Sequence, residues 1–457
     1  MRRKVGPVLA LATVVASISC GDRAGKPNVV LITLDTTRAD HLGCYGYPQD
    51  TSPVLDALAA DAVRFETAIS TTAITPIAHA SIFTGTNPYR HGLRVFYGGA
   101  GDFLTEDHPT MATLLRRAGW ATGAFVSAYP ASERYGMHWG FDAFDTGLDA
   151  AAMTRDPSQL PPHDGLWQRR RTSFAQRRAD ATVDQALTWL EDVGKPFFLW
   201  SHFFDPHDPS LVPPKSVTDR FGAFGVGPDH AKAVYDPEIF FMDREIGRLL
   251  DALRARGDYD DTVIVVVSDH GQGLGDHGWF PHRLLYQEQI RVPLIVRVPG
   301  GRRGVTVPDL VRGIDVLPTI LEIVGVDPPA GVQGQSLVDL MAGRPEPERL
   351  AYAEVLNTLD DLAPDALPQH QKDLLFCTMD RRFKLIHHKL APENTELYDL
   401  ESDPGELENV ARDRPGEVRR LVAALEESGA MDVVPQPPSE PMSRDAVEKL
   451  ESLGYTR

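Results

Sequence analysis

Apolar residues are distributed along the chain in two alternating patterns. Several short runs are apolar at nearly every position and rich in valine, isoleucine and leucine. Runs of about 4–8 such residues are typical of strands buried on both faces of a parallel sheet, whereas apolar residues spaced three or four apart indicate helices. The sequence therefore predicts an α/β fold with a mostly parallel central sheet covered by helices. The predicted strands are residues 28–35, 122–127, 196–205, 262–269 and 293–298, and the predicted helices are residues 52–63, 76–83, 111–118, 180–193, 237–256 and 314–324.

The chain changes character after residue 345. Its apolar runs become shorter, and a single helical pattern follows them. We therefore expect a main domain over residues 27–345 and a small α+β C-terminal subdomain with a tail over residues 346–457. Two polar stretches, residues 149–178 and 205–229, are interpreted either as loops over the functional edge of the sheet or as inert surface insertions. The expected C-terminal strands are residues 350–355, 376–379, 383–387 and 396–400, and the expected helix is residues 415–427.

Three of the predicted strands end at an aspartate, and two of these aspartates are closely followed by histidine. In open α/β sheets the binding crevice lies at the carboxyl ends of the strands, so we expect these side chains at one edge. A single acid after a strand is ordinary turn chemistry. Oxygen and nitrogen donors gathered in this way, however, suit zinc, manganese or similar ions. The candidate metal ligands are Asp35, Asp205, His207, Asp269, His270 and His282.

The stretch 71–85 contains Thr75 where a helix should begin. Threonine is a good N-cap residue, and Pro76 suits the first helical position. A hydroxyl at a helix N-terminus lies beside unpaired N–H groups at the positive end of the peptide dipole, where an alkoxide or an anionic ester is stabilised. By itself the stretch favours an ordinary capped helix. The interpretation of Thr75 as a nucleophile depends on the acids and histidines elsewhere in the chain.

The charge of the chain narrows the range of partners. Of the 457 residues, 42% are hydrophobic and 24% are charged, which is the balance of a folded protein. The formal net charge of −18 disfavours nucleic acid or an anionic membrane surface as the main partner. An anionic substrate is still compatible with this charge, because bound metal ions can invert the local field. The chain has 3 cysteines, which form no zinc-type cluster.

Residues 1–20 differ from the rest of the chain. A basic start, a short apolar segment and Cys20 follow one another, as in an export signal that is too short for a stable membrane span. Cys20 favours a lipoprotein-type signal, in which this cysteine is acylated after cleavage. The preceding Ser17-Ile18-Ser19 departs from the usual lipobox, so ordinary cleavage is the alternative. We expect export to the bacterial periplasm or cell envelope, with a lipid anchor as the sole contact with a membrane.

Segments spread over most of the chain resemble the sulfatase family of the alkaline phosphatase superfamily. This resemblance implies an alkaline phosphatase-like α/β/α sandwich, with the small C-terminal subdomain, and metal-dependent hydrolysis of esters. The segments that carry it are residues 27–46, residues 75–92, Phe203-Phe-Asp-Pro-His207, residues 268–296, Glu396-Leu-Tyr-Asp-Leu400 and residues 403–409.

The chain departs from the family at several important positions. Family sulfatases carry Cys or Ser in a Cys/Ser-x-Pro-x-Arg signature, and that residue is oxidised to formylglycine. Counting back from Thr84-Gly85 aligns Thr75 with the oxidised residue, Ile77 with the proline and His79 with the arginine. The resemblance therefore implies a site without formylglycine. The second acid of the family's Asp-Asp pair and two lysines near the bound sulfate are also replaced, by Thr36, Ser127 and His282.

An unmodified threonine resembles the nucleophile of superfamily phosphodiesterases and phosphoethanolamine transferases, which use zinc-type ions. The resemblance thus implies two divalent ions, zinc or manganese rather than calcium, and attack on phosphorus by Thr75, with His79 as a further group facing the developing charge. The ligands carried over are Asp35, Thr75, Asp269 and His270 for the first ion, and Asp205, His207 and His282, with His277 as an alternative, for the second.

Three functions remain open at this point. The first is a metal-dependent hydrolase of phosphoesters, with phosphodiesters favoured, and the second is a sulfatase that works without formylglycine. The third is a binding protein that keeps the fold but lacks activity, for which so many metal-competent side chains at one edge would be unneeded. In the first two cases the partner is an anionic ester. The sequence determines neither its leaving group nor the oligomeric state.

Overall fold

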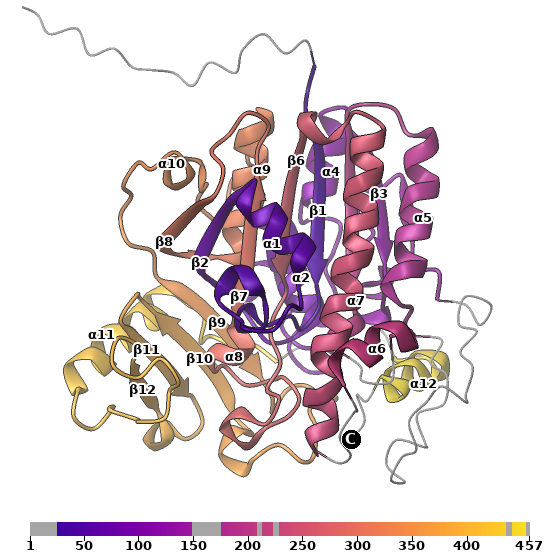
Figure 1. Cartoon of the computed structure of the whole chain (residues 1–457). Helices are drawn as coiled ribbons and strands as arrows, with labels where there is room; N and C mark the ends of the chain where they lie inside the picture. Colours follow the sequence, from indigo (N-terminus) through magenta and orange to yellow (C-terminus); the bar gives the residue numbers. More distant parts are fainter. Residues whose placement is uncertain (1–24, 149–174, 208–212, 223–227, 436–440, 454–457) are drawn as a thin grey trace, which may run out of the picture.

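Eight strands form one central sheet in the order β4-β3-β5-β1-β6-β7-β2-β8 (Figure 1). The computed structural model describes residues 25–148, 175–207, 213–222, 228–435 and 441–453. Neighbouring strands are parallel except at β7, which is antiparallel to β6 and β2. This arrangement confirms the predicted α/β fold. The strands are β1 (Asn28–Leu34), β2 (Val63–Ile69), β3 (Ala121–Val126), β4 (Ala143–Asp145), β5 (Phe197–Phe203), β6 (Thr262–Ser268), β7 (Arg291–Arg297) and β8 (Val305–Arg312).

Helices cover both faces of this sheet, which explains why its central strands are apolar at almost every position. In β1, Val29 and Leu31 join the core on one face, while Val30, Ile32 and Leu34 join the core on the other. The first face is covered by α2 (Thr75–Thr84), α4 (Met111–Arg117) and α9 (Val316–Val324), and the second by α1 (Pro53–Ala60), α5 (Ala179–Asp192) and α7 (Pro228–Ala255). Shorter helices are α3 (Pro88–His91), α6 (Lys215–Phe221), α8 (Gln287–Ile290) and α10 (Val338–Met341).

The three-residue strand β4 and the longer strands β2 and β8 are absent from the predicted set; the reason is clear for β2 and β8. The predicted helix 52–63 ends as α1 at Ala60, and Val63 already begins β2. Both strands lie at one end of the sheet and alternate buried with more exposed positions, such as Arg64 and Glu66 in β2. Because their faces are not both fully covered, they lack the continuous apolar run that identifies the central strands.

The polar stretch 205–229 is more structured than a loop. It contains α6, and α7 begins at Pro228, ahead of the predicted start at Pro237, which lies inside the helix. The expected loop over residues 149–178 falls largely on residues 149–174, which lie outside the described part of the chain, as do the predicted signal over residues 1–20 and residues 208–212.

A second sheet of four antiparallel strands, in the order β12-β11-β10-β9, confirms the small C-terminal subdomain. One of its faces packs on α11 and the other joins the core of the main domain, through residues such as Ala353 and Cys377. The division between residues 345 and 346 remains a prediction. The elements are β9 (Ala351–Leu356), β10 (Leu374–Met379), β11 (Phe383–His388), β12 (Glu396–Asp399) and α11 (Pro415–Ser428).

A last helix, α12 (Arg444–Ser452), was not expected from the sequence pattern. It does not extend the small sheet but packs on the main domain, where Leu450 and Leu453 are buried in the same core as Ala131 and Tyr135. The end of the chain therefore returns to the side of the sheet that carries β3 and β4.

Candidate active site

Two aspartates and a histidine meet at the carboxyl ends of the adjacent strands β1 and β6. Asp35 follows β1, and Asp269 and His270 follow β6; all three are completely buried. One ligand atom from each lies within 4.8 Å of those of the other two. The backbone N–H groups of Thr36 and His270 donate to Asp269 Oδ1 at 3.1 and 2.7 Å and fix its carboxylate. The structure thus brings together the carboxylates that the sequence pattern assigned to these two strand ends.

Thr75 faces this group from the N-terminus of α2. The predicted capping role is wrong, because Ile74 occupies the N-cap position, and Thr75 is the first helical residue. Thr75 is completely buried, and its Oγ1 lies 3.2 Å from His270 Nε2. His270 Nδ1 lies 2.9 Å from the Gly271 carbonyl, so Nδ1 carries the proton and Nε2 accepts from the Thr75 hydroxyl. The hydroxyl is therefore directed into the site and is not used by the helix.

Two further histidines, His282 and His207, lie next to His270. His282 Nδ1 donates to the Ala73 carbonyl at 2.7 Å, which leaves the lone pair of its Nε2 facing His207 Nε2 at 3.3 Å. The ring centroids of His270 and His282 are 4.6 Å apart, and the His207 ring stacks on Phe204 at 4.2 Å. His207, His282 and His270 therefore form a continuous row of imidazoles.

Asp205 and His277 make their contacts elsewhere. Asp205 Oδ1 accepts a hydrogen bond of 3.1 Å from Ala179 N at the start of α5. Asp205 Oδ2 is buried without a hydrogen-bond partner among the described residues. The ring nitrogens of His277 lie 3.1 Å from Glu288 Oε1 and 3.1 Å from the Glu406 carbonyl. Of the residues predicted for a second ion, His207 and His282 are thus the two that stand next to each other.

His79 lies behind Thr75 with both ring nitrogens engaged. Nδ1 donates to the Thr75 carbonyl at 2.8 Å, and Nε2 accepts from Thr33 Oγ1 at 3.0 Å. The direction of the second bond follows because burial lowers the pKa of His79, so the ring is neutral and its only N–H proton is on Nδ1. Thr33 Oγ1 in turn accepts from Trp200 Nε1 at 2.9 Å. His79 is also close to Asp269, with 3.7 Å between Nδ1 and Oδ2. Its hydrogen bonds hold the first turn of α2 against β1.

His202 belongs to the site although it was not among the predicted residues. Its Nδ1 accepts from Ser127 N at 3.3 Å, so its Nε2 carries the proton and donates to Asp35 Oδ2 at 3.3 Å. Burial lowers the pKa of His202 to about 3, so the ring is neutral. The available signal was a histidine inside the apolar strand β5, which pairs with β1. His202 was missed because it lies inside β5, whereas the predicted aspartates lie at the ends of strands.

Comparison with known proteins identifies the family. The family model for sulfatases matches residues 27–326, and a model described as the C-terminal region of N-sulphoglucosamine sulphohydrolase matches residues 275–429. The chain belongs to the sulfatase family. This membership confirms the resemblance to the sulfatase family noted in the sequence, and it makes the chain an ester hydrolase of this metal-dependent family.

Relatives of this sulfatase-family chain span nearly its whole length. An arylsulfatase of Clostridium perfringens is 27% identical over 450 residues, which cover 84% of this chain and 90% of the relative. The structure of a phosphonate monoester hydrolase of Agrobacterium radiobacter is 23% identical with a TM-score of 0.70, covering 92% of this chain and 98% of the other. A structure solved with its substrate, D-glucosamine-2-N,6-O-disulfate, is 21% identical with a TM-score of 0.70 and covers 89% and 98%. In the described part of the chain, no helix has both the length and the apolar character needed to cross a membrane.

The electrostatics of the site fit the divalent metal ion that the family requires. Burial raises the pKa of Asp35 and of Asp269 well above their usual range, and the charge of Asp35 adds to the effect on Asp269. Among the described residues, Asp35 Oδ1, Asp269 Oδ2 and Thr36 Oγ1 are buried without a normal hydrogen bond. A cation bound between two buried carboxylates that face each other in this way would stabilise their charged forms.

The histidines of the site are also held in a form that can bind a metal ion. His270 and His282 each donate Nδ1–H to a backbone carbonyl, and burial lowers the pKa of both rings, so both are neutral and carry a lone pair on Nε2. A carbonyl partner of this kind fixes the tautomer and direction of histidines that bind metals. Thr36, at φ 51°, is a buried residue in the left-handed region, and this backbone strain directs its N–H to Asp269. The donor set thus suits a divalent ion without change.

Proposed function

We propose that the chain hydrolyses phosphoesters, with phosphodiesters preferred, and that unmodified Thr75 is the nucleophile. The observation that carries this proposal is the buried Thr75 hydroxyl, 3.2 Å from His270 Nε2 and adjacent to the paired carboxylates. The side chain does not cap α2, and it contacts the candidate metal ligands His270 and Asp35. A nucleophile held beside the groups that activate it is the expected signature of covalent catalysis.

The substitutions around Thr75 support a site without formylglycine. Threonine, Ile77 and His79 stand where the family signature has the oxidised residue, a proline and an arginine. Ile77 is buried in the core, and both ring nitrogens of His79 are engaged with Thr75 and Thr33, so neither replaces the function of the original side chain. We assign His79 a positioning role, in which it fixes the backbone of Thr75, in place of direct contact with the substrate.

The residues that would hold the first ion are Asp35, Asp269 and His270, with Thr75. His207 and His282 offer ring nitrogens to a second ion, and Asp205 lies two residues before His207 in the chain. Nitrogen-rich donor sets favour zinc or manganese over calcium. When bound, such ions lower the pKa of a hydroxyl and stabilise negative charge on phosphoryl and leaving oxygens.

The protein's own residues orient the reacting groups and keep water out of the site. Asp35 is oriented by the N–H of His202, and Asp269 is oriented by the N–H groups of Thr36 and His270. Thr75 Oγ1 starts from a fixed position at the first turn of α2, where the unpaired N–H groups of the helix favour an anionic ester. Because these groups are already in place, little reorganisation is needed when the covalent ester with Thr75 forms and is hydrolysed.

A direct comparison of substrates tests the proposal. Purified protein, loaded in turn with zinc and manganese, is assayed on 4-nitrophenyl phosphomonoesters, phosphodiesters, phosphonates and sulfates. We expect the largest kcat/KM for a phosphodiester. A largest kcat/KM for the sulfate would instead support the second candidate, a sulfatase without formylglycine, which the relatives named as sulfatases favour. The absence of turnover with all four would support a binding protein.

Export is proposed on the sequence of residues 1–20 alone, which lie outside the described residues. We propose that this segment is removed and that the mature protein lies in the periplasm or cell envelope, anchored by lipid if Cys20 is acylated. Mass spectrometry of the native protein measures both the new N-terminus and the mass of an acyl group. An intact Met1 or Arg2 terminus would contradict the proposal.

A further inference from the structure

His282 lies near the end of a loop whose backbone is strained. The loop, residues 271–283, follows β6, and three backbone hydrogen bonds of 2.9–3.1 Å join its two arms into a hairpin. Residues other than glycine rarely adopt a positive φ, and they keep it only where their surroundings hold them. Of the five described non-glycine residues with a positive φ, three lie in this loop: Leu274 at 49°, His277 at 51° and Arg283 at 90°. Contacts with other segments must therefore hold the end of the loop.

Arg283 is held by the segment that follows β9 in the C-terminal subdomain. Its Nη1 lies 2.6 Å from Asp360 Oδ2, and the two side chains are only 2% and 1% exposed. The Asp360 carboxylate is itself fixed, because it accepts from the backbone N–H groups of Phe96 and Leu362, each at 3.0 Å. The Arg283 carbonyl accepts from Asn357 Nδ2 at 3.3 Å. Both the side chain and the backbone of Arg283 are thus anchored to the subdomain.

A change at Arg283 would be transmitted to His282 through the peptide that joins them. The φ angle of Arg283 sets the direction of this peptide relative to the chain that follows, so relaxation of the strained angle would turn it. Its carbonyl accepts from Trp279 Nε1 at 2.7 Å, and the His282 ring donates Nδ1–H to the Ala73 carbonyl at 2.7 Å. The anchored Arg283 therefore preserves the bonds that place His282 Nε2 opposite His207.

We propose that the Arg283–Asp360 ion pair positions His282, so that the C-terminal subdomain takes part in building the active site. The inference deepens the proposed function and rests on it for the role of His282 in catalysis. Stability alone does not explain the pair, since apolar residues of similar volume often stabilise a protein as well as a buried ion pair does. Arg283 is a positioning residue, because it acts through the backbone of His282.

The test compares Arg283→Met and Arg283→Lys with the wild type. All three side chains carry a Cβ and share the backbone strain at this position, so the comparison isolates the contact with Asp360. Lysine keeps a cation that can pair with this carboxylate, whereas methionine does not. If Arg283→Met does not fold, Asp360→Asn removes the charge that holds Arg283 and is expected to behave in the same way.

The first measurement is hydrogen exchange of the imidazole N–H groups in metal-free protein labelled with ¹⁵N-histidine. His270 and His282 each donate Nδ1–H to a buried carbonyl, so both protons should exchange slowly in the wild type. Variants that lack one of these histidines assign the two signals. Arg283→Met should speed the exchange at His282 by at least about tenfold and leave His270 unchanged. Arg283→Lys should keep most of the protection.

Arg94→Met is the matched control for a loss of stability. It breaks another buried ion pair of the same subdomain, in which Arg94 Nε lies 2.8 Å from Glu354 Oε1 on β9. This variant should leave the exchange at His282 unchanged even where its unfolding temperature falls. Equal acceleration in Arg94→Met and Arg283→Met would overturn the proposal, because it would show that a loosened subdomain is sufficient.

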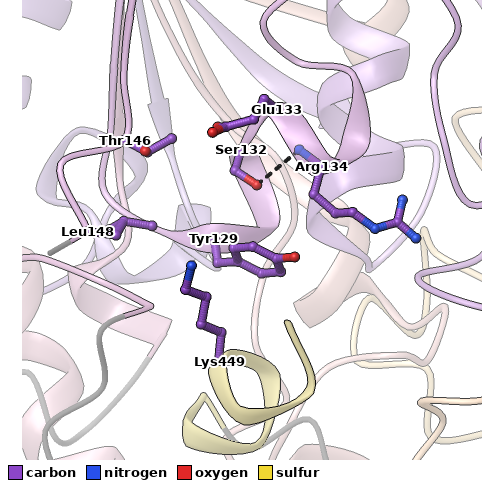
Figure 2. A pocket seen from close by; sticks show the side chains of 7 residues that line it. All are labelled: Tyr129, Ser132, Glu133, Arg134, Thr146, Leu148 and Lys449. Atoms are coloured by element: carbon purple, nitrogen blue, oxygen red, sulfur yellow. Dashed lines mark hydrogen bonds between the residues drawn. The ribbon is translucent and has the colours of Figure 1, made fainter. Parts of the chain in front are cut away.

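A second control lies far along the sheet edge, in a cavity of about 490 Å³ beside α12 (Figure 2). Arg134 lines this cavity and forms a 3.1 Å ion pair with Asp102. None of the candidate metal ligands is among the residues that line it. Arg134→Met should therefore change neither the exchange at His282 nor the activity.

The second measurement is activity with zinc bound. Arg283→Met should lower kcat/KM for the preferred ester about 10–100-fold, as is typical when the support of a metal-binding histidine is lost, and Arg283→Lys should lower it much less. Unchanged exchange at His282 in Arg283→Met would overturn the proposal. Failure of the proposed function is a separate outcome, because it appears as near-native turnover by Thr75→Ala, whereas the exchange measurement requires no substrate.

Discussion

Buried charged side chains are arranged differently in two regions of the molecule. At the carboxyl edge of the large sheet, Asp35 and Asp269 face each other, and both are completely buried. Under the small sheet, Lys384 Nζ and Glu406 Oε1 are equally buried but lie 2.6 Å apart as an ion pair. The first region has like charges together, and the second has opposite charges together.

The contrast separates a structural arrangement from a functional one. The protein pairs buried charges elsewhere as well, for example Arg283 with Asp360 at 2.6 Å and Arg94 with Glu354 at 2.8 Å. Since an unpaired buried charge is costly, the uncompensated carboxylates are explained by a cation that the site binds. Each prediction below tests whether the two regions behave as differently as their charges indicate.

The largest expected effect is at the nucleophile. Thr75→Ala should reduce kcat for the preferred ester by several orders of magnitude, because the covalent intermediate can no longer form. The variant should fold and bind metal nearly as the wild type does, since the side chain does not cap α2. Thr75→Ser should retain measurable activity because it keeps the hydroxyl. Steady-state kinetics with metal analysis measures both; near-native turnover by Thr75→Ala would show that a different nucleophile is used.

The second prediction is a variant that loses activity without losing stability in the metal-free state. Asp269→Asn should lower kcat/KM by at least about a hundredfold through loss of metal. The metal-free variant should be at least as stable as the metal-free wild type, because it removes the repulsion between Asp269 and Asp35. Activity assays and thermal unfolding after chelation provide the two measurements. A metal-free variant clearly less stable than the metal-free wild type would contradict the view that these carboxylates are uncompensated.

The matched change in the other region is Lys384→Met, which leaves Glu406 buried and unpaired. Its free energy of unfolding should fall by about 3–5 kcal/mol, as for other broken buried pairs. The activity of each folded molecule should stay close to that of the wild type. Calorimetry together with active-site titration separates the two quantities, and a stable but inactive variant would reverse the expected roles of the two regions.

Removal of the metal should lower the stability of the protein by an intermediate amount, and only where the carboxylates of the active site are intact. A ligand present at about 100 times its Kd stabilises a folded protein by about 2.7 kcal/mol. Chelation should therefore lower the unfolding temperature of the wild type and of Lys384→Met by similar amounts, and zinc should restore both. Asp269→Asn should respond much less. If all three proteins respond equally to the chelator, the ion is bound away from Asp269.

The smallest expected effect is a pH dependence at Asp205. Burial raises the pKa of this carboxyl to about 7, so the folded protein holds the proton more tightly than the unfolded chain does. The extra stability is complete below the unfolded value near 3.8 and is lost as the pH rises toward 7. Asp205→Asn keeps an oxygen for Ala179 N but cannot ionise. Relative to the metal-free wild type, its stability should therefore rise by about 2–3 kcal/mol between pH 5 and pH 8.

Denaturant unfolding of the two metal-free proteins at both pH values measures this difference. Comparing the two proteins cancels the contribution of the buried histidines, which has the opposite sign because their pKa values are lowered. A difference that does not change with pH would mean that Asp205 is already ionised or fully compensated in the folded protein.

Much of the fold and part of the site followed from local patterns. The continuous apolar runs predicted β1, β5 and β6, because strands covered on both faces leave no polar position along the run. The acids that follow β1 and β6 were expected at one edge because the carboxyl ends of the strands form the binding crevice, and Asp35, Asp269 and His270 do meet there. β2 and β8 escaped prediction because their partly exposed positions break the apolar run.

What the sequence by itself determined is the family, the α/β architecture and the residue types that can bind metal, since these depend on local periodicity and on motifs whose residues are close in the chain. The tertiary structure alone decided which of these side chains meet. His202 joined the site through strand pairing, Asp205 accepts a hydrogen bond from the start of α5, and α12 packs on the core of the main domain. Hydrogen bonds between distant segments fix these choices, because a buried polar group must find a partner wherever the fold provides one.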